Sequence, residues 1–121
     1  MIEFTNVSKV YANGTNALKD INLKIDKGEF VFIVGSSGAG KSTLLKLMMA
    51  EETPTTGEVE INGFKVSKIK KRQKPYLRRS MGIVFQDFRL IPSMNVYDNV
   101  AFAQRVTDVS YREMRRRVPY I

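Results

Sequence analysis

The chain of 121 residues has the length of one domain, and its 43% hydrophobic content indicates a globular rather than a disordered protein. It contains no cysteine, which excludes disulfides and thiolate metal sites, and no histidine, which removes the commonest general base and metal ligand. No segment approaches the ~18 consecutive apolar residues of a membrane span, and the first residues lack a signal-peptide pattern. We therefore expect a soluble, intracellular protein.

The net charge is +8, and the basic residues are clustered. Such clusters are most often solvated surfaces, although they also suit nucleic acid or the inner leaflet of a membrane. Because no aromatic ladder lies among the lysines, nucleic acid ranks last among the partners we expect. The clusters comprise Lys65, Lys68, Lys70, Lys71, Arg72, Lys74, Arg78 and Arg79, and Arg112, Arg115, Arg116 and Arg117.

The first part of the chain is predicted to form antiparallel strands. Near-alternation of apolar and polar residues predicts half-buried strands over 2–11 and 17–25, with turn chemistry at 11–16 between them. A turn at 27–29 then leads into the continuous apolar run Phe30 to Val34, which is typical of a strand buried on both faces.

The next part is predicted to mix helix and strand. A helix is expected over 42–50, and a short strand over 58–61 precedes the hairpin signal Asn62-Gly63. A short helix is expected over 76–79, after Pro75, and a second apolar strand over Met81 to Phe85.

The last part is predicted to be helical. One helix is expected over 96–105, and Ser110 and Glu113 have capping-box spacing ahead of a last helix that Pro119 would end. The whole order, antiparallel strands followed by strand, glycine loop and helix, indicates an α/β core with a β-rich attachment.

A glycine-rich loop joins the apolar run to the helix that follows it. The stretch Gly35-Ser36-Ser37-Gly38-Ala39-Gly40-Lys41-Ser42 satisfies the pattern G-x-x-x-x-G-K-[ST] in full. Glycines let the backbone wrap closely around phosphates with its N–H groups directed inward, and the helix that begins near Lys41 adds its positive end. An ordinary glycine turn would show this pattern in this setting only rarely, so we interpret it as a phosphate-binding loop.

Three side chains of this loop have expected roles. Lys41 would reach the β- and γ-phosphates of a nucleotide as a point charge, and Ser42 would ligate Mg²⁺ through its hydroxyl. Thr43 follows one residue later and would lie close to the α-phosphate.

The chain resembles the N-terminal half of the ATP-binding-cassette (ABC) ATPases. Ser37 to Leu45 has the loop and helix style of that family, Tyr11 ends the first strand where the family carries an adenine-stacking aromatic residue, and Gln86 matches its Q-loop glutamine. The resemblance implies a partial P-loop NTPase core with an N-terminal antiparallel β subdomain over residues 1–121. It also implies that ATP and Mg²⁺ are bound by Tyr11 and residues 35–43, with Mg²⁺ held by Ser42 and Gln86.

Within the family, the segments 76–79, 85–90 and 96–101 are most similar to a bacterial cell-division branch, and relatives in lipoprotein export or macrolide efflux share parts of them. The resemblance implies an integral membrane partner reached through Gln86, a homodimer of the full-length protein, and a peripheral position at the cytoplasmic face of a bacterial membrane. Lys41 and Gln86 are the catalytic candidates.

The family's second half supplies an apolar strand ending in Asp-Glu, a serine-glycine-glycine signature and a switch histidine, and none of them occurs in this sequence. We therefore expect a fragment, a shortened chain or a gene remnant that binds ATP without efficient hydrolysis. A second hypothesis is a non-catalytic module that docks on a membrane partner through residues 86–99. A third is nucleic-acid binding through the first basic cluster.

Overall fold

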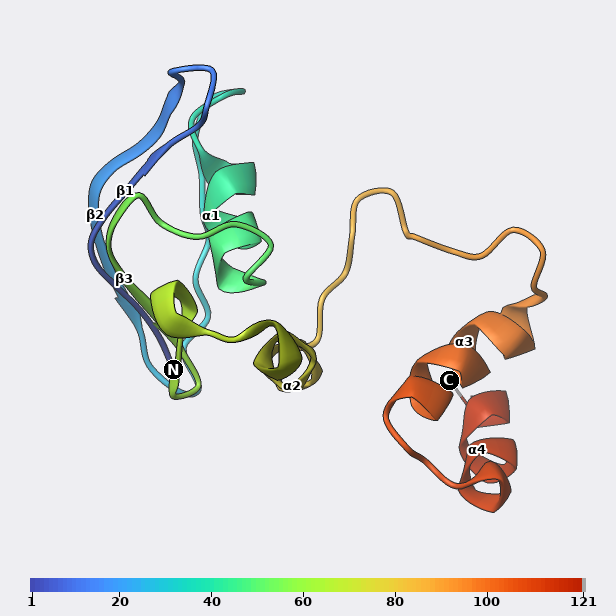
Figure 1. Cartoon of the computed structure of the whole chain (residues 1–121). Helices are drawn as coiled ribbons and strands as arrows, with labels where there is room; N and C mark the ends of the chain where they lie inside the picture. The colour runs from blue at the N-terminus through green and yellow to red at the C-terminus, as the bar shows by residue number, and fades with distance from the viewer. Residues whose placement is uncertain (121) are drawn as a thin grey trace. The chain divides into compact units, whose positions relative to one another are not determined.

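The computed structural model describes residues 1–120. They form two compact units, residues 1–81 and residues 82–120, each with its own hydrophobic core. The first unit carries the sheet and the glycine loop, and the second is helical (Figure 1). Among the described residues, no helix has both the length and the apolarity needed to cross a bilayer.

A four-stranded antiparallel sheet in the order β2-β1-β3-β4 forms one layer of the first unit. Both long strands predicted at the N-terminus are confirmed, and they pair with each other. The strands are β1 (Ile2–Val10), β2 (Asn16–Ile25), β3 (Thr56–Ile61) and β4 (Phe64–Lys65).

An irregularity in β1 decides which of its residues face the core. The register shifts between Phe4 and Val7, and Asn6 there has a left-handed φ of 48°. An extra residue moves every later side chain to the opposite face of the sheet. The buried positions of β1 are accordingly Phe4, then Val7 and Lys9.

Helix α1 (Lys41–Met48) covers one face of the curved sheet (Figure 1). It buries Leu44, Leu47 and Met48, the i, i+3, i+4 spacing of an amphipathic helix. The predicted helix over 42–50 is therefore confirmed. These side chains share one core with residues of the sheet and of the segment after it: Phe4, Val7, Leu18, Ala50, Val59, Ile61, Val66 and Leu77.

The predicted hairpin is also confirmed. Asn62 and Gly63 form a two-residue loop between β3 and β4 with φ values of 47° and 83°, as a type I′ turn requires. After the short turns η1 (Val66–Lys68) and η2 (Lys71–Gln73), helix α2 (Lys74–Arg79) buries Leu77.

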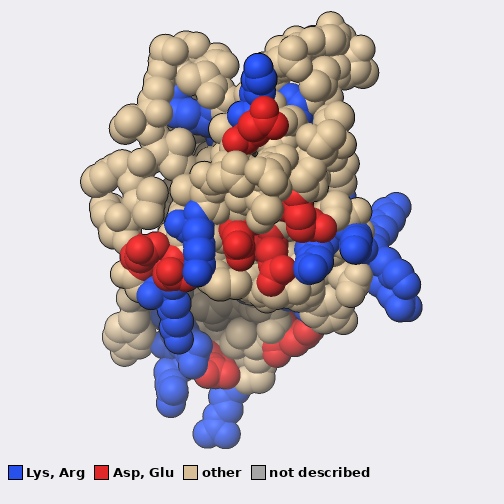
Figure 2. Space-filling model, turned by 90° about the vertical axis from the view of Figure 1, so that its left-hand side faces the viewer, with Lys and Arg blue, Asp and Glu red and all other residues tan. Residues whose placement is uncertain are grey.

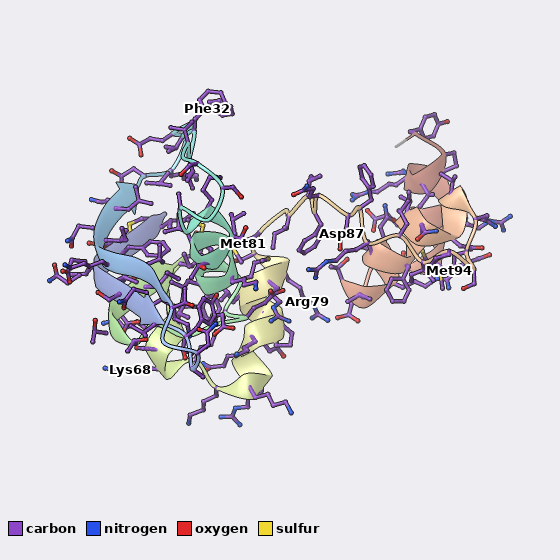
Figure 3. All side chains as sticks on the ribbon, turned by 90° about the horizontal axis from the view of Figure 1, so that it is seen from above. Phe32, Lys68, Arg79, Met81, Asp87 and Met94 are labelled. Atoms are coloured by element: carbon purple, nitrogen blue, oxygen red, sulfur yellow. The ribbon has the colours of Figure 1, made fainter. Side chains whose placement is uncertain are left out.

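Two predicted strands are wrong. Within the described residues, Phe30–Val34 pairs with no strand, and Phe30, Phe32 and Val34 are 84%, 79% and 86% exposed. Figure 3 shows the Phe32 side chain projecting away from the rest of its unit. Met81–Phe85 is likewise outside any strand, and Val84 is 95% exposed. The apolar runs indicate burial, but a strand buried on both faces also needs partner strands, and residues 1–120 do not supply them.

The second unit consists of α3 (Val96–Val106), α4 (Tyr111–Arg117) and the turn η3 (Val118–Tyr120) around a small core of Ala101, Met114 and Val118. Both predicted helices are confirmed. The Ser110 hydroxyl accepts a hydrogen bond from the Glu113 backbone N–H, as the sequence pattern predicts.

Charges of both signs alternate over the face shown in Figure 2, where Lys and Arg side chains extend outward between Asp and Glu.

One carboxylate in the first unit is fixed by several hydrogen bonds. Glu58 of β3 accepts hydrogen bonds from the Ser67 hydroxyl, from the Ser67 backbone N–H and from the Val59 backbone N–H. Partial burial alone would raise the pKa of Glu58, but these hydrogen bonds and the nearby charge of Lys65 lower it overall.

The exposed run Phe30–Val34 predicts self-association of this chain. An exposed apolar segment with unpaired backbone groups can pair with other chains, so this chain should sediment faster than a 13.8 kDa monomer at micromolar concentration. Replacing Phe32 with lysine should return the chain toward monomer. Leu45→Lys is the control, since Leu45 is also exposed, at 51%, but lies on a helix. A parent that sediments as a monomer would contradict the prediction.

Glu58 predicts a pH-dependent stability. Because its pKa is lower in the folded chain than its ordinary 4.5, the ionised group contributes stability above that pH and loses it as the pH falls through the folded value. Glu58→Gln should therefore lower the free energy of unfolding at pH 7, by about 1–3 kcal/mol, and differ less from the parent at pH 3. Urea unfolding followed by circular dichroism measures this, with Glu60→Gln on the same strand as control. A constant difference at both pH values would disprove it.

Candidate nucleotide site

The glycine loop takes its shape from left-handed backbone at two glycines. Gly38 and Gly40 have φ values of 80° and 90°, and α1 begins directly after Gly40. Gly40 also packs tightly, because a Cβ there would lie 2.5 Å from the Ala17 carbonyl oxygen. The N-terminus of α1 has no side-chain cap and no acidic residue in its first turn, which leaves its positive end available to an anion.

The Lys41 ammonium is folded back onto the loop. Its Nζ donates to the carbonyl oxygens of Gly35 and Ser36 at 2.6 and 2.7 Å. The positive charge is thereby held within the loop by neutral acceptors. A phosphate group carries a net negative charge, so its oxygens would compete well with these neutral carbonyls for the ammonium.

Tyr11 lies next to the first turn of α1. It follows the last residue of β1, and its hydroxyl lies 3.2 Å from the Thr43 hydroxyl in a hydrogen bond that either group could donate. Thr43 is buried, whereas Ser42 is exposed. Of the two hydroxyl-bearing residues after Lys41, Ser42 is therefore open to solvent and Thr43 is not.

A hollow of about 350 Å³ joins these groups. Of the residues predicted from the sequence, it is lined by Tyr11, Ser37, Gly38, Gly40, Lys41, Ser42 and Thr43. The end of the turn after β1 and the first residues of β2 also line it, through residues that sequence reasoning missed: Thr15, Asn16 and Ala17. Their closeness in sequence to Tyr11, across the β1–β2 turn, is the signal that could have found them.

The other predicted residues have different places. Gly35, Ser36 and Ala39 complete the loop, where Gly35 and Ser36 hold Lys41 and the Ala39 backbone N–H donates to the Ser36 carbonyl at 3.2 Å. Gln86 is exposed and belongs to the second unit. Its role in catalysis and in binding Mg²⁺ stays a prediction.

The chemistry of the hollow suits a polyphosphate with a divalent cation. Lys41, the first residues of α1 and several hydroxyl-bearing residues line a single space, and they carry one ammonium, backbone N–H groups and hydroxyls. These are donors for phosphate oxygens, and a serine hydroxyl is an oxygen ligand of the hard kind that Mg²⁺ takes.

Gly40 predicts the sharpest glycine effect in the loop. Gly40→Ala adds a clash with the Ala17 carbonyl to the strain of a left-handed φ, and should lower the free energy of unfolding by about 2–4 kcal/mol. Gly14→Ala is the control, because Gly14 has a similar φ of 82° and open space around it. Urea unfolding of both variants checks this, and equal losses would show that the packing against Ala17 is unimportant.

Comparison with known proteins identifies the family of this chain. The family model described as ABC transporter matches residues 18–119. The cell division ATP-binding protein FtsE of Mycobacterium tuberculosis is 50% identical over 122 residues, covering 100% of this chain and 53% of the relative. FtsE of Bacillus subtilis is 47% identical, covering 98% of this chain and 52% of the relative.

A solved structure is also similar to this chain over almost all of its residues. It is a dimeric, post-hydrolysis state of an ATP-binding cassette bound to ADP and Pi, with a TM-score of 0.88 and 38% identity, covering 99% of this chain and 55% of the other. The chain thus spans about half the length of the relatives it matches. Because the family's model matches most of the sequence, the chain belongs to the ABC transporter family.

Proposed function

We propose that this chain is the nucleotide-binding part of an FtsE-like ABC ATPase, the N-terminal portion of one nucleotide-binding domain. The observation that carries the proposal is the hollow in which Lys41, Ser42 and Tyr11 meet at the N-terminus of α1. It combines phosphate-binding groups with an aromatic ring, as the recognition of a nucleotide requires.

Lys41 is the main phosphate ligand in this proposal. On nucleotide binding its ammonium would exchange the carbonyls of Gly35 and Ser36 for the β- and γ-phosphates. The loop's backbone N–H groups and the positive end of α1 would bind the remaining phosphate charge. Bound Mg²⁺ supplies charge neutralisation between the phosphates, and Ser42 is the residue of this loop that would hold it.

Tyr11 and Gln86 have further roles in this proposal. The Tyr11 ring would stack on the adenine, and its place in the lining of the hollow supports this role. Gln86 would contact Mg²⁺ and the attacking water, and would transmit the state of the site to a membrane partner. ATP hydrolysis by this chain alone would be inefficient, because the sequence lacks the Asp-Glu strand end, the signature and the switch histidine of the family.

The proposed partner is an integral membrane protein of the FtsX type. The chain would then act at the cytoplasmic face of a bacterial membrane, as the homodimeric ATPase of a complex that links cell division to cell-wall hydrolases. The similarity to FtsE supports the partner, and the dimeric cassette structure supports the dimer. ATPases of lipoprotein export or macrolide efflux are the alternative within the family.

A docking module without catalysis is the second candidate. Phe88 and Leu90 in the second unit are 75% and 67% exposed, which suits a surface that binds another protein. This candidate differs in one measurable respect: partner binding through residues 86–99 would depend neither on Lys41 nor on Mg-ATP.

Calorimetry of Mg-ATP binding to this chain tests the proposal. Lys41→Ala should abolish measurable binding, a loss of at least about thirtyfold, because the charge that binds the phosphates is removed. Lys46→Ala is the matched control on the last turn of the same helix and should bind as the parent does. Equal binding by Lys41→Ala, or no binding by the parent, would overturn nucleotide binding by this loop.

A further inference from the structure

Lys9 is a buried lysine that the predicted site does not use. Its residue exposure is 9%, which is rare for lysine unless the ammonium is paired. It does not line the hollow, but it stands two residues before Tyr11, which does. The shift of register in β1 is what directs Lys9 inward, because it places the odd-numbered residues after Asn6 on the core side.

The Lys9 ammonium interacts with a carboxylate, a backbone carbonyl and an aromatic ring. Its Nζ lies 2.7 Å from Glu52 Oε2 and donates to the Thr53 carbonyl at 2.9 Å. The same nitrogen lies 5.2 Å from the centre of the Tyr11 ring, within the range of a cation–π contact. Glu52 and Thr53 lie in the segment that follows α1, so Lys9 joins this segment to the Tyr11 ring.

Tyr11 is therefore held at two points. The charge of Lys9 attracts its ring, and its hydroxyl is hydrogen-bonded to Thr43 in the first turn of α1. The two attachments limit the rotation of the side chain. A ring that is already oriented loses less conformational entropy when a base stacks on it.

We propose that Lys9, fixed by Glu52, is a positioning residue that holds the Tyr11 ring in place for a purine base. The proposal rests on the proposed function, because it needs a nucleotide in the hollow. Lys9 acts on the base through Tyr11, and its ammonium is bonded to Glu52 and Thr53, which lie outside the phosphate loop. Its effect should thus depend on the presence of both the base and the Tyr11 ring.

A double-mutant cycle with two ligands tests this. The parent, Lys9→Met, Tyr11→Leu and the double variant are titrated with Mg-ATP and with Mg-tripolyphosphate, which has phosphates but no base. Lys9→Met should weaken Mg-ATP binding about threefold to tenfold and leave tripolyphosphate binding unchanged. In the Tyr11→Leu background, Lys9→Met should have no further effect on either ligand.

Two further variants separate positioning from stability. Lys24→Met on β2 removes an exposed lysine, with a side chain 58% exposed, and should bind as the parent does. Glu52→Gln keeps the shape of the residue beside Lys9. It should weaken the binding of Mg-ATP by a smaller factor than Lys9→Met does, and should leave the binding of Mg-tripolyphosphate unchanged. If circular dichroism shows that Lys9→Met is unfolded, Glu52→Gln takes its place in the test.

Each outcome has a distinct meaning. Unchanged Mg-ATP binding in both Lys9→Met and Glu52→Gln, or equal losses for the two ligands, overturns the positioning role while nucleotide binding stands. An effect of Lys9→Met that persists in the Tyr11→Leu background also overturns it. If the parent binds neither ligand, the proposed function fails, and the role of Lys9 fails with it.

Discussion

The attachment of α1 to the sheet is the constraint on which the phosphate-binding loop depends. The helix is anchored by a continuous core under Leu44, Leu47 and Met48. Its first turn is hydrogen-bonded to Tyr11, and the segment after it is bound by Lys9. Because the loop leads directly into α1, the position of the helix fixes the end of the loop that lies next to it, and with it the N–H groups there. The loop itself contributes little apolar contact.

The net charge of the chain has a simple origin. Residues 65–79 contain eight of the 20 Lys and Arg residues and no Asp or Glu, so the +8 of the whole chain equals the charge of this segment. Two of the eight serve the fold: Lys74 donates to the Ala50 carbonyl and Arg78 to the Met49 carbonyl. Both carbonyls lie at the C-terminal end of α1, where cations are favourable. Part of this cluster is thus structural.

Two apolar segments of the chain are exposed in the described residues. Phe30–Val34 and Val84 expose side chains of the kind that a sheet buries, and the chain spans about half the length of its relatives. Hydrophobic patterning shows only which residues favour burial. Strand formation also needs hydrogen-bonding partners, so the apolar residues of β1 form a strand, with β2 and β3 beside it, and those of Phe30–Val34 do not.

The sequence by itself determined the features that local chemistry controls. Alternation placed β1 and β2, and Asn62-Gly63 placed the hairpin. The spacing of Gly35, Gly40 and Lys41 predicted a phosphate-binding loop directly before a helix, and α1 begins there. Tertiary structure decided what depends on contacts between distant segments. Only the fold shows that Lys9 is buried against Glu52, that Thr15–Ala17 line the hollow, and that Lys41 rests on carbonyls of its own loop. The physical reason is that a register shift at Asn6 and the packing of α1 set these contacts, and neither can be deduced from the periodicity of one segment.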